Sequence, residues 1–408
     1  MHSRTTHAEG TAQGRAPGVY LHFAVRDRLD GVRTGRPVFI GRPHSSPQPE
    51  AHPGVHIHRL SVWEDFALTV GEPPPEGSFL GPAVRGFFEN GGAQCLVVTC
   101  SVDRWPALLN DDSRIYASVL SEFDDIDLVC APDLAKETAD QRLALQRQLL
   151  AHCDRLQDRF VILDAPADAT ATDAARQWDD LVSPNGALYF PWVLPNRRSG
   201  RNTHAGGEDH RWVPPCGHIA GVYARTDRRV GVHKAPANEV LEDVVDIRVH
   251  VSDEEQSVLN DVGVNCLRAL PGRGIRIWGA RTLSGQVEWR YVNVRRLFIA
   301  LRRWIDSECV DLVFDSNDSQ LWNRIRDRVT NYCYALYQSG ALKGETPEEA
   351  YYVKCDAETN PAGERAVGKV TAEIGLAANR PAEFIVVRIT QEAASGSTEG
   401  TSRIRERS

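Results

Sequence analysis

The sequence contains side chains suited to catalysis or to metal binding, but few of them lie close together along the chain. His52, His56 and His58 are the best metal candidates, since the last two would share one face of an extended strand and His52 lies in the loop before it. No cysteine is near them, and only Glu50 supplies a carboxylate. A solvated loop therefore accounts for this cluster better than a metal site does.

Carboxylates beside expected strands form the second candidate group. Asp124, Asp125 and Asp127 stand just before an apolar run, where acidic residues commonly end a helix and begin a turn. Asp164 ends the run FVILD, a position at which α/β enzymes place catalytic groups, but no companion nucleophile accompanies it.

Catalytic motifs are missing from the sequence. It contains no Walker A, G-x-S-x-G, H-E-x-x-H or G-x-G-x-x-G pattern. We therefore predict a protein that is not an enzyme, with no catalytic residue, no cofactor and no metal. A hydrolase-like site in the α/β half remains the alternative, and converging Ser, His and Asp side chains in one pocket would support it.

Composition restricts the class of protein further. The 408 residues carry 47 basic and 55 acidic side chains, a net charge of −8, which argues against a dedicated nucleic-acid binder. No run of eighteen apolar residues occurs and the N-terminal stretch lacks an apolar segment, so we expect neither membrane insertion nor a secretory signal. The nine scattered cysteines predict buried, reduced thiols in a cytosolic protein.

Short apolar runs alternate with helical stretches between Pro37 and about Arg211. The expected strands are residues 38–40, 95–99, 127–131, 160–164 and 187–190, and the expected helices are 80–90, 105–122, 135–155 and 171–181. This alternation predicts an α/β domain with a mostly parallel sheet and crossover helices. The polar stretch 197–212 is typical of a linker or a long surface loop.

The second half has a different pattern, in which strands surround two strong helices. The expected strands are residues 244–251, 274–278, 287–290, 351–355, 367–374 and 383–389, and LPGRGIRIWG (270–279) is read as a hairpin turn. One helix spans Val292–Glu308, and the other runs from about Ser319 to Ser339, capped by Asp318 or Ser319 and ended by Gly340. These elements predict an α+β C-terminal domain.

The helix at 292–308 carries a row of basic residues. Arg295, Arg296, Arg302 and Arg303 fall opposite its apolar stripe and form a positive ridge on an acidic protein. Only five of the 47 basic residues are lysines, so codon bias inflates the arginine count. The ridge is either a solvated face or a contact with an acidic partner surface.

Taken together, these segments resemble the contractile tail sheath proteins of phages and of extracellular-type contractile injection systems. The resemblance covers Arg15 to Gln391. It rests on PGVYLHF (17–23), FLGPAVRGFFENGGAQCLVV (79–98), DLVCAPD (127–133), AHCDRLQDRFVILDAP (151–166), ALYFPWV (187–193), VPPCGHIAGVYARTDRRVGVHKAPANE (213–239), LNDVGVNCLRALPGRGIRIWGARTL (259–283), EWRYVNVRRLFIALRRWI (288–305) and PAEFIVVRIT (381–390).

The resemblance implies four regions. They are an N-terminal arm (1–26), an α/β middle domain facing outward (27–212), an α+β inner domain facing a tube (213–382), and a C-terminal arm with a flexible tail (383–408). The arms would exchange the strands 17–26 and 383–389 between subunits. The residues concerned are Val19, Tyr20, Leu21, Phe23 and Val25 at one end and Phe384, Ile385, Val386, Val387 and Ile389 at the other. The four arginines of the ridge would then be candidates for the tube-facing contact.

The function implied is that of a structural subunit. Stacked hexameric rings would assemble around an inner tube in the cytoplasm, contract once, and drive the tube through a target envelope. Lysis would release the particle. The partners implied are neighbouring sheath subunits, the inner tube protein, and baseplate and cap proteins, with no nucleic acid. A minor sheath paralogue near the baseplate or cap is the alternative within the same family.

Overall fold

The computed structural model describes residues 32–45, 54–74, 77–101, 103, 105, 120, 123–196, 212–312, 315–366 and 368–382. Both expected arm strands (17–26 and 383–389) and most of the expected helix at 105–122 lie outside the described residues. The chain divides into residues 1–30 and a unit from residue 31 onward. The fold given below is that of the second unit.

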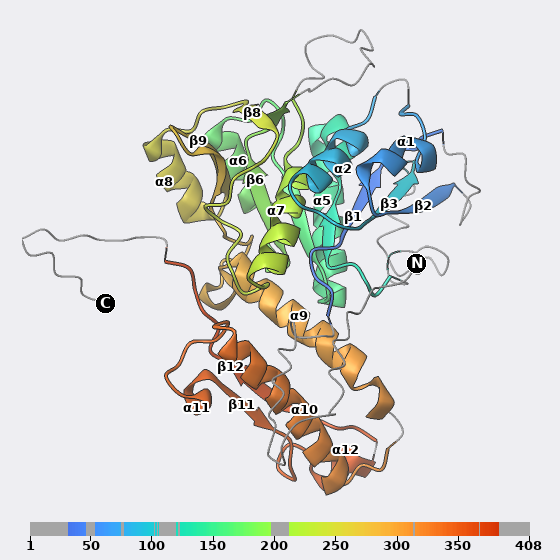
Figure 1. Ribbon diagram of the computed structural model, residues 1–408, viewed down its shortest axis with the longest axis vertical. Coiled ribbons are helices and arrows are strands. Elements are labelled where there is room, and N and C mark those ends of the chain that lie inside the picture. Colours follow the sequence, from blue (N-terminus) through green and yellow to red (C-terminus); the bar gives the residue numbers. More distant parts are fainter. Residues whose placement is uncertain are drawn as a thin grey trace, which may run out of the picture. The chain divides into compact units, whose positions relative to one another are not determined.

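Within the described residues, eight strands form one sheet (Figure 1). Its spatial order is β10-β9-β6-β5-β4-β1-β3-β2. The strands are β1 (Pro37–Gly41), β2 (Val55–Leu60), β3 (Cys95–Cys100), β4 (Leu128–Cys130), β5 (Phe160–Asp164), β6 (Gly186–Phe190), β9 (Asn265–Leu270) and β10 (Gly274–Trp278). Neighbours from β3 to β9 are parallel, whereas β2 and β10 pair antiparallel at the edges. The prediction of a mostly parallel sheet is confirmed.

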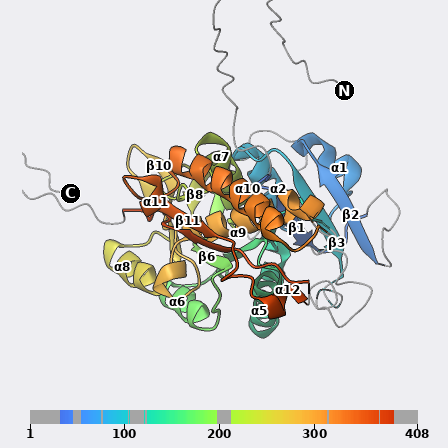
Figure 2. The same cartoon turned by 90° about the horizontal axis from the view of Figure 1, so that it is seen from below.

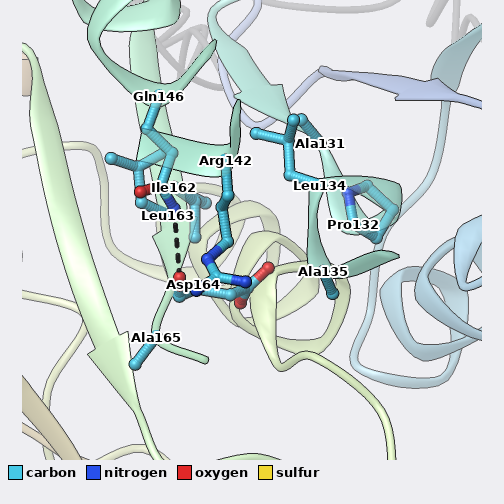
Figure 3. A pocket seen from close by; sticks show the side chains of 10 residues that line it. All are labelled: Ala131, Pro132, Leu134, Ala135, Arg142, Gln146, Ile162, Leu163, Asp164 and Ala165. Atoms are coloured by element: carbon cyan, nitrogen blue, oxygen red, sulfur yellow. Dashed lines mark hydrogen bonds between the residues drawn. The ribbon is translucent and has the colours of Figure 1, made fainter. Parts of the chain in front are cut away.

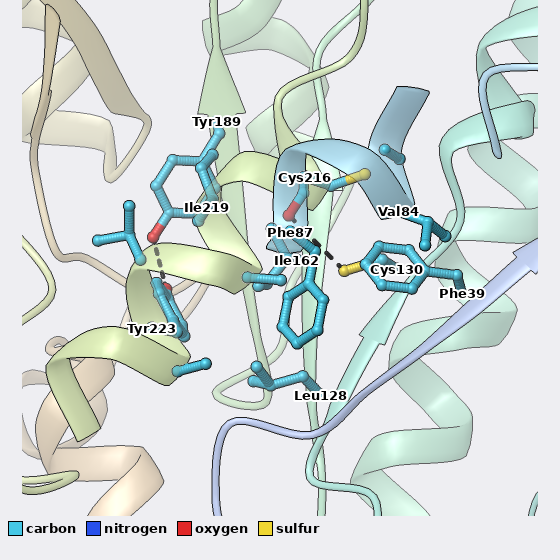
Figure 4. Close-up of a cluster of buried hydrophobic side chains, with 14 of the residues drawn as sticks. Phe39, Val84, Phe87, Leu128, Cys130, Ile162, Tyr189, Cys216, Ile219 and Tyr223 are labelled. Atoms are coloured by element: carbon cyan, nitrogen blue, oxygen red, sulfur yellow. Dashed lines mark hydrogen bonds between the residues drawn. The ribbon is translucent and has the colours of Figure 1, made fainter. Parts of the chain in front are cut away.

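Helices cover both faces of this sheet, which explains why its strands read as continuous apolar runs. On one face lie α2 (Leu80–Glu89) and α7 (Cys216–Arg229). On the other lie α5 (Ala139–Leu156), α6 (Ala171–Asp179) and α8 (Asp253–Val262). Alternate residues of one strand enter the two cores, and Figure 4 shows part of the core beneath α2 and α7.

Glycines allow α2 and α7 to pack with their backbones in close contact. A Cβ on Gly217 would lie 2.0 Å from the carbonyl oxygen of Ala83, and a Cβ on Gly221 would lie 2.4 Å from that of Phe87. Each distance is far below a van der Waals contact, so a side chain at either position would force the helices apart. The sequence pattern does not predict α7, because residues on all sides of this helix are buried and no single apolar stripe marks it.

The domain boundary expected at residue 212 is wrong. Strands β9 and β10 lie beyond it, yet they extend the same sheet next to β6. The chain also returns to the sheet domain at once, since Val213 and Val193 exchange backbone hydrogen bonds of 2.9 and 3.1 Å. Val193 and Val213, on either side of the polar stretch in the sequence, thus belong to the same core.

The C-terminal lobe, as we call residues 292–382, has its own core. It contains α9 (Val292–Glu308), α10 (Ser319–Gln338), α11 (Pro347–Ala350), β11 (Tyr351–Lys354), α12 (Ala362–Ala366) and β12 (Glu373–Leu376). The two long helices pack through Trp304 and Tyr332, whose rings stack 4.1 Å apart, and β11 pairs antiparallel with β12. Figure 2 shows α10 and β11 of this lobe from below. As predicted, the Asp318 side chain accepts hydrogen bonds from the first backbone amides of α10.

The remaining elements are short. They are η1 (Trp63–Asp65), α1 (Phe66–Thr69), η3 (Pro132–Lys136), β7 (Val193–Pro195), β8 (Val244–Ile247), η5 (Val287–Trp289) and η6 (Val310–Leu312). The strand expected at 287–290 is wrong, because this stretch forms the helical turn η5. The hairpin expected at 270–279 is confirmed by the antiparallel pairing of β9 with β10. All nine cysteines are free thiols, and all except Cys309 are buried.

Candidate functional site

The four arginines of α9 do not form one exposed ridge. Arg295 and Arg296 are only 8% and 2% exposed, so the expectation that these two face a partner is wrong. The reason is that the first half of α9 lies between two cores: Val292 and Ile299 belong to the core of the sheet domain, whereas Leu297 belongs to that of the C-terminal lobe. No side of the helix is left for solvent there.

Arg296 lies at the centre of a buried ion-pair cluster. Its guanidinium donates to Asp227 at 2.6 and 2.9 Å and to Asp127 at 3.0 Å, and it lies 4.8 Å from the centre of the Tyr223 ring. Tyr223 in turn hydrogen-bonds the hydroxyl of Tyr189 on β6 at 2.5 Å. We call Arg296, Asp127, Asp227 and Tyr223 the Arg296 cluster; it connects α9 to α7 and to the residue that precedes β4.

The charges of this cluster depend on one another. Burial alone would lower the pKa of Arg296, but the neighbouring carboxylates of Asp227 and Asp127 outweigh it and raise that pKa. Burial raises the pKa of Asp227 even though the guanidinium opposes the shift. One cation therefore stabilises two buried carboxylates, and its loss would leave them uncompensated.

The Arg296 cluster also holds the segment that enters β1. Asp127 accepts backbone hydrogen bonds from Gly35 at 3.1 Å and from Arg36 at 2.7 Å. Gly35 has a φ of +72°, and a Cβ there would lie 2.6 Å from the Cα of Ala224 on α7. Only glycine suits this position, and the segment is therefore fixed against α7.

Arg302 and Arg303 differ from the buried pair. Arg303 is half-buried and donates to the carbonyl oxygens of Ile126 and, at 2.7 Å, of Asp124, so it ties α9 to the loop before β4. The Arg302 side chain is 48% exposed and lies 3.6 Å from Asp306. Of the four arginines only Arg302 keeps the exposure that a tube contact requires.

Asp164 ends β5 beside a small cavity of about 10 Å³, which Arg142 and Gln146 of α5 also line (Figure 3). One carboxylate oxygen accepts the backbone amide of Cys216, the first residue of α7, at 2.8 Å. Burial raises the pKa of Asp164 to about 7, and burial also raises that of the Cys216 thiol. The described lining residues include no histidine or serine. The carboxylate thus caps a helix, and the alternative of a hydrolase-like site gains no support from this cavity.

The histidine cluster does not assemble into a metal site in the part of the chain that the structure describes. His56 and His58 lie on β2 with stacked rings 6.3 Å apart, and His52 is outside the described residues. Burial, followed by the neighbouring His56, lowers the pKa of His58 to about 4. Among the described side chains, no group of three or more His, Cys, Asp or Glu is placed to hold a metal ion.

The Arg296 cluster includes a residue that the sequence analysis missed. Asp227 lies in the run TDRR, which is typical of an exposed helix end. The available signal was its place one turn after Tyr223 on a helix of small and apolar residues, where a charged group must find a partner. The sequence pattern places Asp127 in a turn and gives no sign that its side chain pairs with a buried arginine.

Two family models match the chain. Residues 115–283 match the phage tail sheath protein central domain, and residues 286–392 match the phage tail sheath C-terminal domain. The junction between them, near residue 284, agrees with a sheet domain that includes β9 and β10 and a separate C-terminal lobe. None of the described helices is both long and apolar enough to pass through a membrane.

Solved structures resemble the chain over almost its whole length. The helical sheath of the anti-feeding prophage in its contracted state is 31% identical, with a TM-score of 0.73, and the match covers 93% of this chain and 99% of that one. The contracted sheath complex of PVC, an extracellular contractile injection system, is 29% identical, with a TM-score of 0.72, covering 94% and 99%.

Among curated proteins, the tail sheath protein of Salmonella phage ViI is 28% identical over 256 residues, which cover 56% of this chain and 38% of that protein. The chain spans less than half the length of the curated relatives that it matches.

Proposed function

Because the chain belongs to the phage tail sheath family, we propose that it is a sheath subunit of a contractile particle. It polymerises as stacked hexameric rings around an inner tube, and it contracts to drive that tube through a target envelope. The observation that carries this proposal is the near-complete likeness to the contracted helical sheath of the anti-feeding prophage. The other partners are baseplate and cap proteins. Assembly takes place in the cytoplasm, and lysis releases the particle.

The β11–β12 pair supports the exchange of arm strands. It is a two-stranded sheet with Tyr351 opposite Leu376 and Lys354 opposite Glu373, and among the described residues each strand has one unpaired edge. Two strands alone are marginally stable, and free edges accept further strands through main-chain hydrogen bonds. The arm strands 17–26 and 383–389 of neighbouring subunits fill these edges.

The Arg296 cluster supports a path for mechanical load between the arms and the body. Residues 35 and 36, which follow the N-terminal arm, bind Asp127, and Asp127 binds Arg296 on α9. The same helix packs on α10 through Trp304 and leads into the lobe that carries β11 and β12. A force on the arm is therefore transmitted to the C-terminal lobe through buried ion pairs rather than through a loop.

Contraction needs no nucleotide in this proposal. The subunit moves as a rigid body from an extended state, stored at assembly, to a contracted state with larger contacts between outer domains. The continuous core beneath α2 and α7 suits such a motion, since the close helix contacts at Gly217 and Gly221 leave little room for internal rearrangement.

Electron microscopy of the purified protein tests the proposal. We expect helical tubes or hexameric rings, and long sheaths of defined length once the tube and baseplate proteins of the same particle are co-expressed. Dispersed monomers under both conditions would contradict it.

Deletion of residues 1–26 tests the arm assignment. The truncated protein should keep its thermal unfolding midpoint, because the described core begins after the deleted stretch, but it should not form long sheaths. Sheaths of normal length from this variant would refute the assignment. Deletion of residues 383–408 should give a related loss of assembly together with some loss of stability, because the strand 383–389 also completes a sheet in its own domain. Unchanged thermal unfolding and unchanged assembly would refute this assignment.

A second role has one observation in its favour. The chain is also 31% identical to a chain in the six-fold symmetrised baseplate of the anti-feeding prophage, with a TM-score of 0.70. A minor sheath paralogue near the baseplate would therefore fit. Copy number separates the two roles: the main sheath is the dominant band of a purified particle, whereas a paralogue is present in only a few rings.

A further inference from the structure

A basic cavity of about 240 Å³ lies at the end of the edge strand β2, outside the Arg296 cluster. Its polar lining consists of Arg33, Arg36, Arg59, Ser61, Gln94 and Asp125. These residues come from the segment before β1, from the end of β2, from the start of β3 and from the loop before β4. Four separate parts of the chain thus bring polar groups to one opening.

The charges of this cavity are not balanced among its described residues. Three guanidinium groups meet one carboxylate, because Asp125 is shared by Arg36 at 3.2 Å and Arg59 at 2.7 Å. Arg33 is exposed, and the described residues offer it no recorded ion pair. Burial, followed by repulsion from Arg33, lowers the pKa of Arg36. The described lining residues therefore carry an excess of about two positive charges.

Part of the cavity lining is held in a fixed orientation before any ligand binds. Arg36 donates to Gln94 and Asp125, and Gln94 donates to Ser61 at 3.5 Å, so one guanidinium is held in place. The Arg59 guanidinium lies 5.3 Å from the centre of the Phe123 ring. The Arg59 side chain is 61% exposed and pairs with Asp125 through one nitrogen, so it keeps donors for a second carboxylate, and a charge-assisted hydrogen bond from a planar guanidinium gives direction as well as attraction.

We propose that this cavity receives a carboxylate side chain from a neighbouring copy of the same chain. The inference rests on the proposed polymerisation, and it names a contact surface of that polymer. The chain carries a net charge of −8, so a second copy offers many carboxylates to a positive opening. Val62, which follows the lining residue Ser61, is 46% exposed, and an exposed apolar side chain beside the cavity suits a protein partner better than a free anion.

A lysine-specific cross-link tests this contact. The chain contains only five lysines, so an added one reports its own surroundings with little background. We would assemble a mixture of ¹⁴N- and ¹⁵N-labelled R33K, and separately R59K, and join amines to carboxylates with a carbodiimide. We expect peptides that link position 33 or 59 of one copy to an Asp or Glu of a differently labelled copy.

The variant R176K is the matched control for the chemistry. Arg176 is exposed on α6, and its only recorded ion pair among the described residues is with Asp173 at 3.7 Å. R176K should therefore link to Asp173 within one copy. If that control reacts while R33K and R59K give only links within a copy, such as to Asp125, the proposal is overturned.

Charge reversal gives an independent measurement. R33E/R59E should reduce the amount of assembled protein at least tenfold at low salt, while R147E/R176E, which reverses two exposed arginines on α5 and α6, should not. Thermal unfolding of both double variants checks that they fold. Normal assembly of a folded R33E/R59E would also overturn the proposal.

Inorganic phosphate tests whether a free anion, and not a carboxylate of a second copy, occupies the cavity. If phosphate raises the unfolding midpoint of the unassembled wild type but not of R33Q/R59Q, and no links between copies form, then a free anion occupies the cavity and the proposal is wrong. If R33K and R59K assemble but form no links between copies, the cavity contact alone is refuted. A wild type that never assembles refutes the proposed function, and this inference with it.

Discussion

Arginines in the two halves of α9 lie in opposite environments. In the first half, Arg296 is 2% exposed and pairs with two carboxylates, and Arg295 donates to the Asn185 side chain at 2.6 Å. In the second half, the Arg302 side chain is 48% exposed, with one carboxylate 3.6 Å away. The difference shows that the position of an arginine on the helix does not by itself determine whether its side chain is buried. The side chain stabilises the fold where other elements cover the helix, and it is exposed where they do not.

Removal of the buried guanidinium gives the largest expected effect. Arg296→Ala should lower the free energy of unfolding by about 3–5 kcal/mol, because it leaves Asp127 and Asp227 buried without a cation. Denaturant unfolding measures the change. The triple variant R296M/D127N/D227N, which removes all three charges, should recover part of the loss. If R296A lost no more stability than R302A, the distinction between the two halves would fail.

Asp164, a buried carboxylate with no ion pair to an arginine among the described residues, gives a smaller, pH-dependent effect. Burial raises the pKa of Asp164 to about 7 from an ordinary value of 3.8, so the folded protein holds this proton over a range in which the unfolded chain releases it. The wild type should therefore lose stability relative to Asp164→Asn as pH rises from about 4 to about 7, with no further change above that range.

The expected size of this effect follows from the pKa shift. One unit corresponds to about 1.4 kcal/mol, so the difference between wild type and D164N should change by a few kcal/mol across the range. Asparagine keeps an oxygen that accepts the Cys216 amide, so the variant preserves the cap. Unfolding measured at several pH values would contradict the assignment if the difference between the two proteins stayed constant.

Much of the fold was predictable because its signals are local. Buried parallel strands read as apolar runs, and the bounds of α9 follow from its stripe and flanking residues, so both were predicted well. The helix α7 was missed because glycines and alanines pack it on several sides, which removes the periodic contrast that marks a helix. A helix was therefore predictable where apolar and polar residues alternate with its own period, and not simply where its residues are hydrophobic.

The candidate site was less predictable because it depends on contacts far apart in the sequence. The ion pair between Arg296 and Asp127 joins residues separated by 169 positions. An amphipathic pattern assigns a basic residue to solvent when it lies opposite the apolar stripe. That rule failed at Arg295 and Arg296, because a second layer covers the other side of α9, and it held at Arg302, where this layer ends.

The smallest effect on stability, and the one that bears on function, is expected at Arg302. Because the side chain is half-exposed and its pair with Asp306 is an i,i+4 contact, Arg302→Ala should change the free energy of unfolding by less than about 0.5 kcal/mol. Yet an exposed charge repeated in every subunit of a helical array can guide assembly on an acidic tube. Arg302→Glu should therefore reduce tube-templated assembly while thermal unfolding stays unchanged, and the defect should shrink at high salt, where such contacts are screened within about 3 Å at 1 M.

Arg147→Glu is the matched control, since that side chain is 53% exposed with a single ion pair to Asp180. If R302E and R147E assemble equally well on the tube, Arg302 does not face it, and α9 contributes only its buried half.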